Sequence, residues 1–267
     1  MIFFKRFLKL AAILGIAGYL LLCGLLYFCQ EQLLFAPEKL KEGYQFEFLN
    51  SFEERNISTG SGNIINTLLF KQENSKGVIF YLHGNAGSLR SVGNVSQHFL
   101  PLGYDVFMID YPGYGKSSSV INNQDELFED IQDVYNELKK RYSEDTIVVL
   151  GYSLGTGLAA KLASHNRPDK LVLHAPYYSM TYMMRLNYSY IPSFILKYDL
   201  ATNSYLKDCK MPVYLFHGVD DGLIPIESSE LLSKELDLPL YKLTDQGHNN
   251  LAGNAEALLL LKEVLND

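Results

Sequence analysis

Short apolar runs that alternate with helical patterns constrain the fold of this chain more than any other feature. The runs lie at residues 77–83, 104–110, 146–151, 170–174 and 211–217. A strand that helices cover on both faces needs such a continuous run, because neither face meets water. Helical periodicity is found between or after them, at residues 125–141, 154–164, 226–236 and 254–265. The alternation predicts an α/β protein with a doubly wound, mostly parallel sheet.

Three further segments complete the expected sheet, and one long segment interrupts the alternation. Residues 45–49, 63–70 and 238–243 are strand-like. Residues 177–210 replace a simple helix between two strands, and we interpret them as a small cap or lid insertion. Because no Pro-, Gly- or Ser-rich linker follows, we expect residues 44–267 to form one domain.

The N-terminal segment has the pattern of a membrane anchor. Basic residues precede an uncharged, mostly apolar run at residues 10–30. About twenty apolar residues match the ~30 Å hydrocarbon core of a bilayer, whereas a cleaved signal peptide has a shorter apolar region. We therefore expect one transmembrane helix within residues 1–31. The charges are mixed at residues 31–42, which favours a cytoplasmic N-terminus with the remaining domain on the opposite side of a single-pass membrane protein.

Composition excludes several other classes of function. The net charge of −7 argues against nucleic acid as a partner, since phosphate binding needs clustered basic residues. Cys209 is the one cysteine after the first thirty residues, so the domain has no internal disulfide. No Cys-x-x-Cys or His-x-x-x-His spacing is present, and we expect neither a metal nor another cofactor.

A serine in a glycine-flanked turn is the first candidate for chemistry. Ser153 is the centre of Gly151-Tyr152-Ser153-Leu154-Gly155. The pentapeptide alone is a weak signal, but here it follows an expected strand and opens a helix rich in small residues. A nucleophile elbow needs this arrangement, because the strained turn lifts the serine hydroxyl above the sheet. We therefore expect Ser153 to be a nucleophile.

A serine hydroxyl needs a base, and two histidines follow it by enough sequence. His217 lies at the end of a strand, directly before Gly218, where a structural role is the simpler interpretation. His248 lies in a polar loop between the last strand and the last helix, from which it can reach the sheet edge. The order and location favour His248 as the base.

The acid that orients the base is expected in the loop after the preceding strand. Asp220 and Asp221 both lie in that loop. Either carboxylate can accept the imidazole Nδ1–H, and the other would be solvated or cap the turn. The residues themselves leave this choice open.

Two backbone amides are expected to form an oxyanion hole. One is the amide of Leu154, directly after the nucleophile, and the second is that of Asn85 in the turn His83-Gly-Asn-Ala-Gly87. No Gly-Lys-Ser/Thr follows this turn, so it is not a phosphate loop. A second glycine turn begins at Asp110, whose carboxylate we expect to accept backbone hydrogen bonds.

Five motifs in a fixed order give the sequence a family resemblance. They are His-Gly-Asn-Ala-Gly, Asp-Tyr-x-Gly-Tyr-Gly-x-Ser, Gly-Tyr-Ser-Leu-Gly, His-Gly-x-x-Asp-x-x-Ile-Pro and Gly-His-Asn, between residues 77 and 250. The succession resembles the α/β-hydrolase fold, in particular its membrane-anchored branch of small serine hydrolases. The resemblance implies that Asp221 is the acid, and that the chain hydrolyses carboxylic esters or thioesters through an acyl-enzyme.

The expected substrate is a small-molecule or lipid acyl ester. The cap at residues 177–210 is rich in Tyr and Met, which suits either an acyl pocket at the membrane surface or a cap that packs on the domain's own core. Two alternatives remain beside the esterase. One is a serine peptidase, and the other is a non-catalytic, membrane-tethered binding protein on the same fold.

Overall fold

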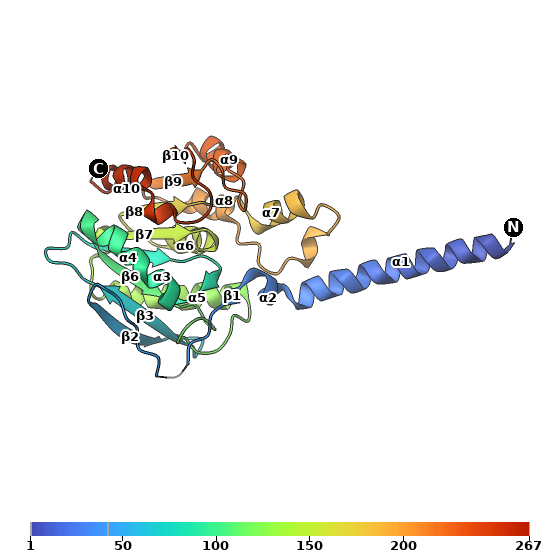
Figure 1. Ribbon diagram of the computed structural model, residues 1–267, viewed down its shortest axis with the longest axis horizontal. Coiled ribbons are helices and arrows are strands. Elements are labelled where there is room, and N and C mark those ends of the chain that lie inside the picture. Colours follow the sequence, from blue (N-terminus) through green and yellow to red (C-terminus); the bar gives the residue numbers. More distant parts are fainter. Residues whose placement is uncertain (1, 42, 267) are drawn as a thin grey trace.

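The computed structural model describes residues 2–41 and 43–266. Met1, Glu42 and Asp267 lie outside the described residues. Met1 is the first residue of the expected anchor, and Asp267 is the last residue of the expected domain. A long helix, α1 (Ile2–Phe28), extends away from a sheet domain (Figure 1). None of its residues is buried, and its 27 residues correspond to about 40 Å at 1.5 Å per residue. The helix is therefore long and apolar enough to cross a membrane.

Eight strands of the described chain form one sheet in the order β10-β9-β8-β7-β4-β6-β3-β2. The strands are β2 (Phe52–Ser58), β3 (Ile64–Phe70), β4 (Val78–Leu82), β6 (Asp105–Ile109), β7 (Ile147–Tyr152), β8 (Lys170–His174), β9 (Val213–Gly218) and β10 (Leu240–Leu243). All pairs are parallel except those that β3 makes with β2 and β6. The expected doubly wound, mostly parallel sheet is confirmed.

The expected strand at residues 45–49 is wrong. This segment is irregular, and the antiparallel edge strand is β2 at Phe52–Ser58 instead. The aromatic side chains of Phe46 and Phe48 suggested a strand, but they pack in a cluster with Phe52 and Phe70. The alternation of Phe46 and Phe48 with polar residues therefore reflects the packing of these side chains and not pairing in the sheet.

Helices cover both faces of the sheet (Figure 1). They are α3 (Leu89–Val92), α4 (Ser96–Phe99), α5 (Gln124–Leu138), α6 (Leu154–His165), α8 (Thr202–Tyr205), α9 (Glu227–Leu236) and α10 (Ala255–Val264). Side chains of α5, α6 and α9 share one apolar core with the sheet, and those of α3, α4 and α10 share the other. The helices expected after residue 124 are confirmed. The one-turn helices α3 and α4 were not predicted, because a single turn shows no periodicity.

The cap packs on the domain core with only part of its side chains. It contains α7 (Met180–Asn187) and a loop that leads to α8. Tyr177 and Tyr198 are fully buried in the domain core, whereas Tyr188, Tyr190 and Phe194 at the tip of the cap are exposed. Part of the cap therefore packs on the core, and its tip remains at the surface.

A short helix, α2 (Gln30–Leu34), fastens the N-terminal segment to the cap. The buried Gln30 side chain donates to the Ile195 carbonyl and accepts from the Lys197 amide, at 2.9 and 2.6 Å. The Glu31 carboxylate accepts hydrogen bonds from Lys197 Nζ and the Tyr198 hydroxyl. Hydrogen bonds that are buried or partly buried thus hold the segment after the long helix against the cap.

Candidate active site

Ser153 occupies a strained turn between strand β7 and helix α6. Its backbone has φ +53° and ψ −120°, a combination that costs energy for any residue other than glycine. Gly155 permits this turn, because a Cβ there would lie 2.1 Å from the carbonyl oxygen of Leu82 on strand β4. Close packing of the helix against the sheet therefore requires the second glycine of the motif and places Ser153 at the carboxyl end of the parallel strands.

His248 faces the serine from the loop that follows strand β10. Its Nε2 lies 2.9 Å from Ser153 Oγ, within hydrogen-bond distance. The Tyr152 hydroxyl donates to the His248 carbonyl at 2.9 Å, and the two rings stand 5.4 Å apart. These contacts hold the loop over the sheet edge, although serine and histidine are far apart in the sequence.

Asp221 contacts the histidine, and Asp220 does not. Asp221 Oδ2 lies 2.7 Å from His248 Nδ1, and Oδ1 accepts the amides of Leu223 and Ile224 at 2.9 and 2.8 Å. The Asp221 side chain is fully buried, whereas Asp220 is exposed. Of the two adjacent carboxylates, the structure brings Asp221 into a chain of contacts with the base and the serine.

Hydrogen bonds keep Asp221 ionised. Burial alone would raise the pKa of this carboxyl group, but hydrogen bonds from His217, His248 and the Ile224 amide outweigh burial and hold the pKa well below its usual range. An ionised acid can accept a hydrogen bond from the Nδ1–H of His248, which leaves Nε2 free to accept the proton of the serine hydroxyl.

His217 is a site residue that the sequence interpretation treated only as structural. It is fully buried at the end of strand β9, and its Nε2 lies 3.2 Å from Asp221 Oδ2 and 2.8 Å from the Ile224 carbonyl. Because both neighbours of Nε2 are acceptors, this nitrogen carries a proton and donates to them. Nδ1 pairs with the Ser229 hydroxyl at 2.6 Å. His217 thus positions Asp221. The sequence feature that could have indicated this role is the position of His217 four residues before the acid.

The two amides expected to form the oxyanion hole lie beside the serine. Asn85 and Leu154 line the same cavity of about 160 Å³ as Ser153. Within the part of the chain that the structure describes, neither backbone N–H donates to a backbone carbonyl. Leu154 is the first residue of helix α6, where an N–H has no partner within the helix. Both donors are therefore available to a bound group.

The loop that contains Asn85 is held from two sides. The Tyr114 hydroxyl donates to the Asn85 carbonyl at 2.6 Å, and Asp110 Oδ1 accepts the amide of Leu89 at 2.8 Å, as its position predicted. On the other side, strand β1 (Ala36–Pro37) pairs in parallel with strand β5 (Ala86–Gly87). The segment that follows the N-terminal helix therefore packs directly against the loop expected to supply an oxyanion donor.

Comparisons with known proteins agree with this geometry. Residues 73–203 match a family model described as serine aminopeptidase, S33. The lysophosphatidylserine lipase ABHD12 of Danio rerio is 29% identical, over 66% of this chain and 50% of that protein. The chain thus spans about half the length of this relative. The human alpha/beta hydrolase domain-containing protein 17B is 26% identical, over 78% of this chain and 73% of that protein.

Solved structures show the same fold. An esterase of Pyrococcus furiosus superposes with a TM-score of 0.68 at 19% identity, and the match covers 87% of this chain and 97% of the esterase. The sheet order, the serine turn and these matches lead to one conclusion. The chain has the α/β-hydrolase fold, and an apolar N-terminal helix is joined to it.

Proposed function

We propose that this protein cleaves carboxylic esters or thioesters of acyl, lipid-like substrates through an acyl-enzyme on Ser153. The observation that carries the proposal is the continuous hydrogen-bonded chain from Ser153 through His248 to the buried Asp221. The neighbouring cavity is lined mainly by apolar residues, which suits an acyl group. The chemistry needs no other reactive group, since serine, base and acid together suffice for acyl transfer.

The proposed reaction has two halves. Ser153 Oγ attacks the carbonyl carbon while its proton passes to His248 Nε2, and the oxyanion accepts hydrogen bonds from the amides of Asn85 and Leu154. The alcohol or thiol then leaves with the proton from His248. A water molecule attacks the acyl-enzyme in the same way, which releases the acid and restores Ser153.

A serine peptidase is the second candidate, because the matching family model is described as an aminopeptidase. An aminopeptidase must bind the free amino group of its substrate, and a carboxylate is the usual partner for such a cation. Among the described residues that line the cavity at Ser153, none is acidic. This observation favours an acyl ester over a peptide.

We also propose how the parts are arranged in the cell. Residues 1–31 would form a single-pass membrane anchor, and residues 44–267 would form the hydrolase domain with residues 177–210 as its cap. Lys5, Arg6 and Lys9 precede the apolar run, which supports a cytoplasmic N-terminus and a domain on the opposite side.

The test uses a fluorophosphonate probe and the full-length protein in detergent. We expect the probe to label the wild type and p-nitrophenyl butyrate to be hydrolysed, while Ser153→Ala loses both signals. Ser164→Ala, on the helix that follows Ser153, is the matched control and should keep both. Equal labelling of the wild type and Ser153→Ala would exclude Ser153 as the nucleophile and leave the non-catalytic binding protein as the better description. Faster cleavage of aminoacyl p-nitroanilides than of esters would favour the peptidase.

A further inference from the structure

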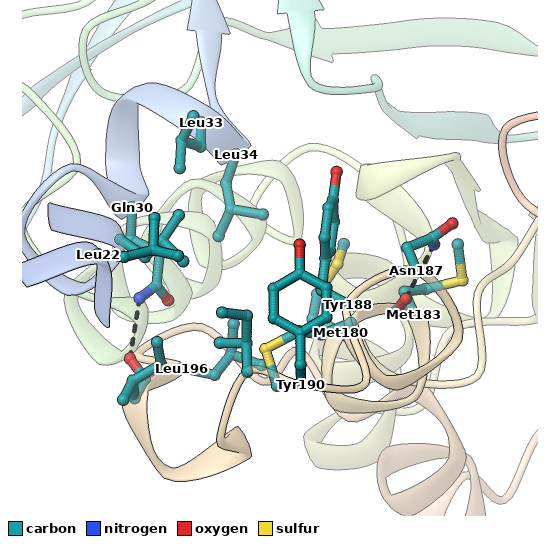
Figure 2. A pocket seen from close by; sticks show the side chains of 14 residues that line it. Leu22, Gln30, Leu33, Leu34, Met180, Met183, Asn187, Tyr188, Tyr190 and Leu196 are labelled. Carbon is teal, nitrogen blue, oxygen red and sulfur yellow. Dashed lines mark hydrogen bonds between the residues drawn. The ribbon is translucent and has the colours of Figure 1, made fainter. Parts of the chain in front are cut away.

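A second cavity lies between the N-terminal helices and the cap. Its volume is about 550 Å³, within the range of small-molecule sites in proteins. Figure 2 shows Leu22, Leu33 and Leu34 on one side of this space and Met180, Met183 and Tyr190 on the other. Its walls therefore come from two segments that are about 150 residues apart in the sequence.

This cavity adjoins the one at the serine. Leu33, Leu34, Met180 and Met183 line both spaces, so these four side chains form the boundary that the cavities share. A molecule whose ester group lies at Ser153 can extend past this boundary into the larger space. Methionine side chains are flexible and adapt to irregular apolar shapes, which suits a passage of variable width.

The larger cavity is mainly apolar, and its polar lining side chains are those of Gln30, Asn187, Tyr188 and Tyr190. Most of its lining side chains are Leu, Ile or Met. The amide of Gln30 already bonds the Ile195 carbonyl and the Lys197 amide, so it is not free to bind a substrate. Among the described residues none that lines this cavity is charged, so a charged group would lose its hydration here without an opposite charge, whereas a hydrocarbon chain gains by leaving water.

The far end of the cavity lies at the apolar helix. Leu22 and Leu26, which belong to α1, line it. The tip of the cap lies beside the same helix, because the Tyr19 hydroxyl donates to the Tyr190 carbonyl at 2.8 Å. Tyr188, Tyr190 and Phe194 of the cap tip are exposed. Aromatic side chains of this kind are typical of the interface between a bilayer and water.

We propose that the two cavities form one acyl-binding groove for the long fatty acyl chain of a lipid ester, which enters from the bilayer between α1 and the cap. The N-terminal helices are thus a wall of the substrate site as well as an anchor. The inference rests on the proposed ester hydrolysis and adds to it the length of the acyl chain and the path by which that chain enters.

The experiment fills the distal part of the groove and leaves Ser153 untouched. The variants are Leu22→Trp and Met184→Trp, each made in the full-length protein and measured in detergent. Leu22 and Met184 line the larger cavity and not the cavity at Ser153. Leu21→Trp and Leu186→Trp are the matched controls, since these exposed leucines lie on the same two helices outside the cavity. The measured quantity is kcat/KM for p-nitrophenyl butyrate and p-nitrophenyl palmitate.

The proposed groove predicts that the filling variants lose hydrolysis of the long-chain ester more than hydrolysis of the short-chain ester. Excluding two methylene groups from an apolar site corresponds to about a tenfold loss, so Leu22→Trp and Met184→Trp should reduce kcat/KM for palmitate by about tenfold or more. The ratio of kcat/KM for palmitate to that for butyrate should fall accordingly, whereas Leu21→Trp and Leu186→Trp should keep both values. Thermal unfolding of each variant shows whether it is folded. Palmitate hydrolysis that the filling variants leave intact, or that the control variants reduce equally, would overturn the groove. A wild type that cleaves neither ester would instead overturn the proposed function.

Discussion

Replacing Asp221 by asparagine tests the proposed mechanism most directly. Oδ1 of Asp221 accepts the amides of Leu223 and Ile224, at 2.9 and 2.8 Å, and these bonds fix which end of the side chain faces the histidine. In Asp221→Asn the carbonyl oxygen keeps the two amides, so the NH₂ group takes the position of Oδ2, 2.7 Å from His248 Nδ1. An NH₂ group donates, and Nδ1 must then accept.

The consequence for catalysis follows from the tautomer. With Nδ1 as an acceptor, the proton of neutral His248 lies on Nε2, which faces Ser153 Oγ at 2.9 Å. That nitrogen can no longer take the proton of the serine. Loss of the correct tautomer costs about 10⁴-fold in kcat in a serine protease, or about 5.4 kcal/mol of transition-state stabilisation. We expect a loss of similar size here.

The assay compares kcat for p-nitrophenyl butyrate in the wild type, Asp221→Asn and Asp220→Asn. Asp220 is exposed, so its substitution should leave kcat unchanged. Thermal unfolding of each variant shows whether the fold is retained. A folded Asp221→Asn that keeps kcat within about tenfold of the wild type, or an equal loss in Asp220→Asn, would refute the assignment of the acid.

Two further predictions concern stability. Gly155→Ala places a Cβ 2.1 Å from the Leu82 carbonyl oxygen and should cost about 1–3 kcal/mol or more, seen as a lower Tm. Gly222→Ala, with no atom within 4 Å of its Cβ, is the control, and equal Tm values would contradict the close packing. Burial raises the pKa of Asp110 to about 7. Relative to Asp110→Asn, the wild type should therefore lose stability as the pH rises from about 4 to about 7, and parallel Tm profiles would contradict this prediction.

Local patterns of the sequence are sufficient to predict the layers of the fold. A strand covered on both faces shows a continuous apolar run wherever it pairs, and an amphipathic helix shows its periodicity within a few turns. The serine turn also has a local signal, because Gly151 is required by close contacts with Gly155 and Thr156 of the adjoining helix. The apolar N-terminal helix also follows from composition alone.

Contacts between distant segments decided what these patterns left open. The burial of Phe46 and Phe48 imitates the pattern of a strand, and only the packed structure shows that β2 forms at Phe52–Ser58. The choice between Asp220 and Asp221 depends on which side chain turns inward beside His217 and His248. Among the residues of the sequence, only the motif that carries the family resemblance distinguished the two carboxylates.

The clearest case is the wall that the N-terminal helices build beside the cap. Nothing near Gln30 in the sequence indicates that its amide bonds the backbone of residues 195 and 197. The sequence by itself determined that residues 2–28 form an apolar helix and that Ser153 lies in an elbow. Only the tertiary structure placed that helix against the cap and brought the apolar cavity between them next to the cavity at the serine, because such a space is formed by side chains that meet after the chain has folded.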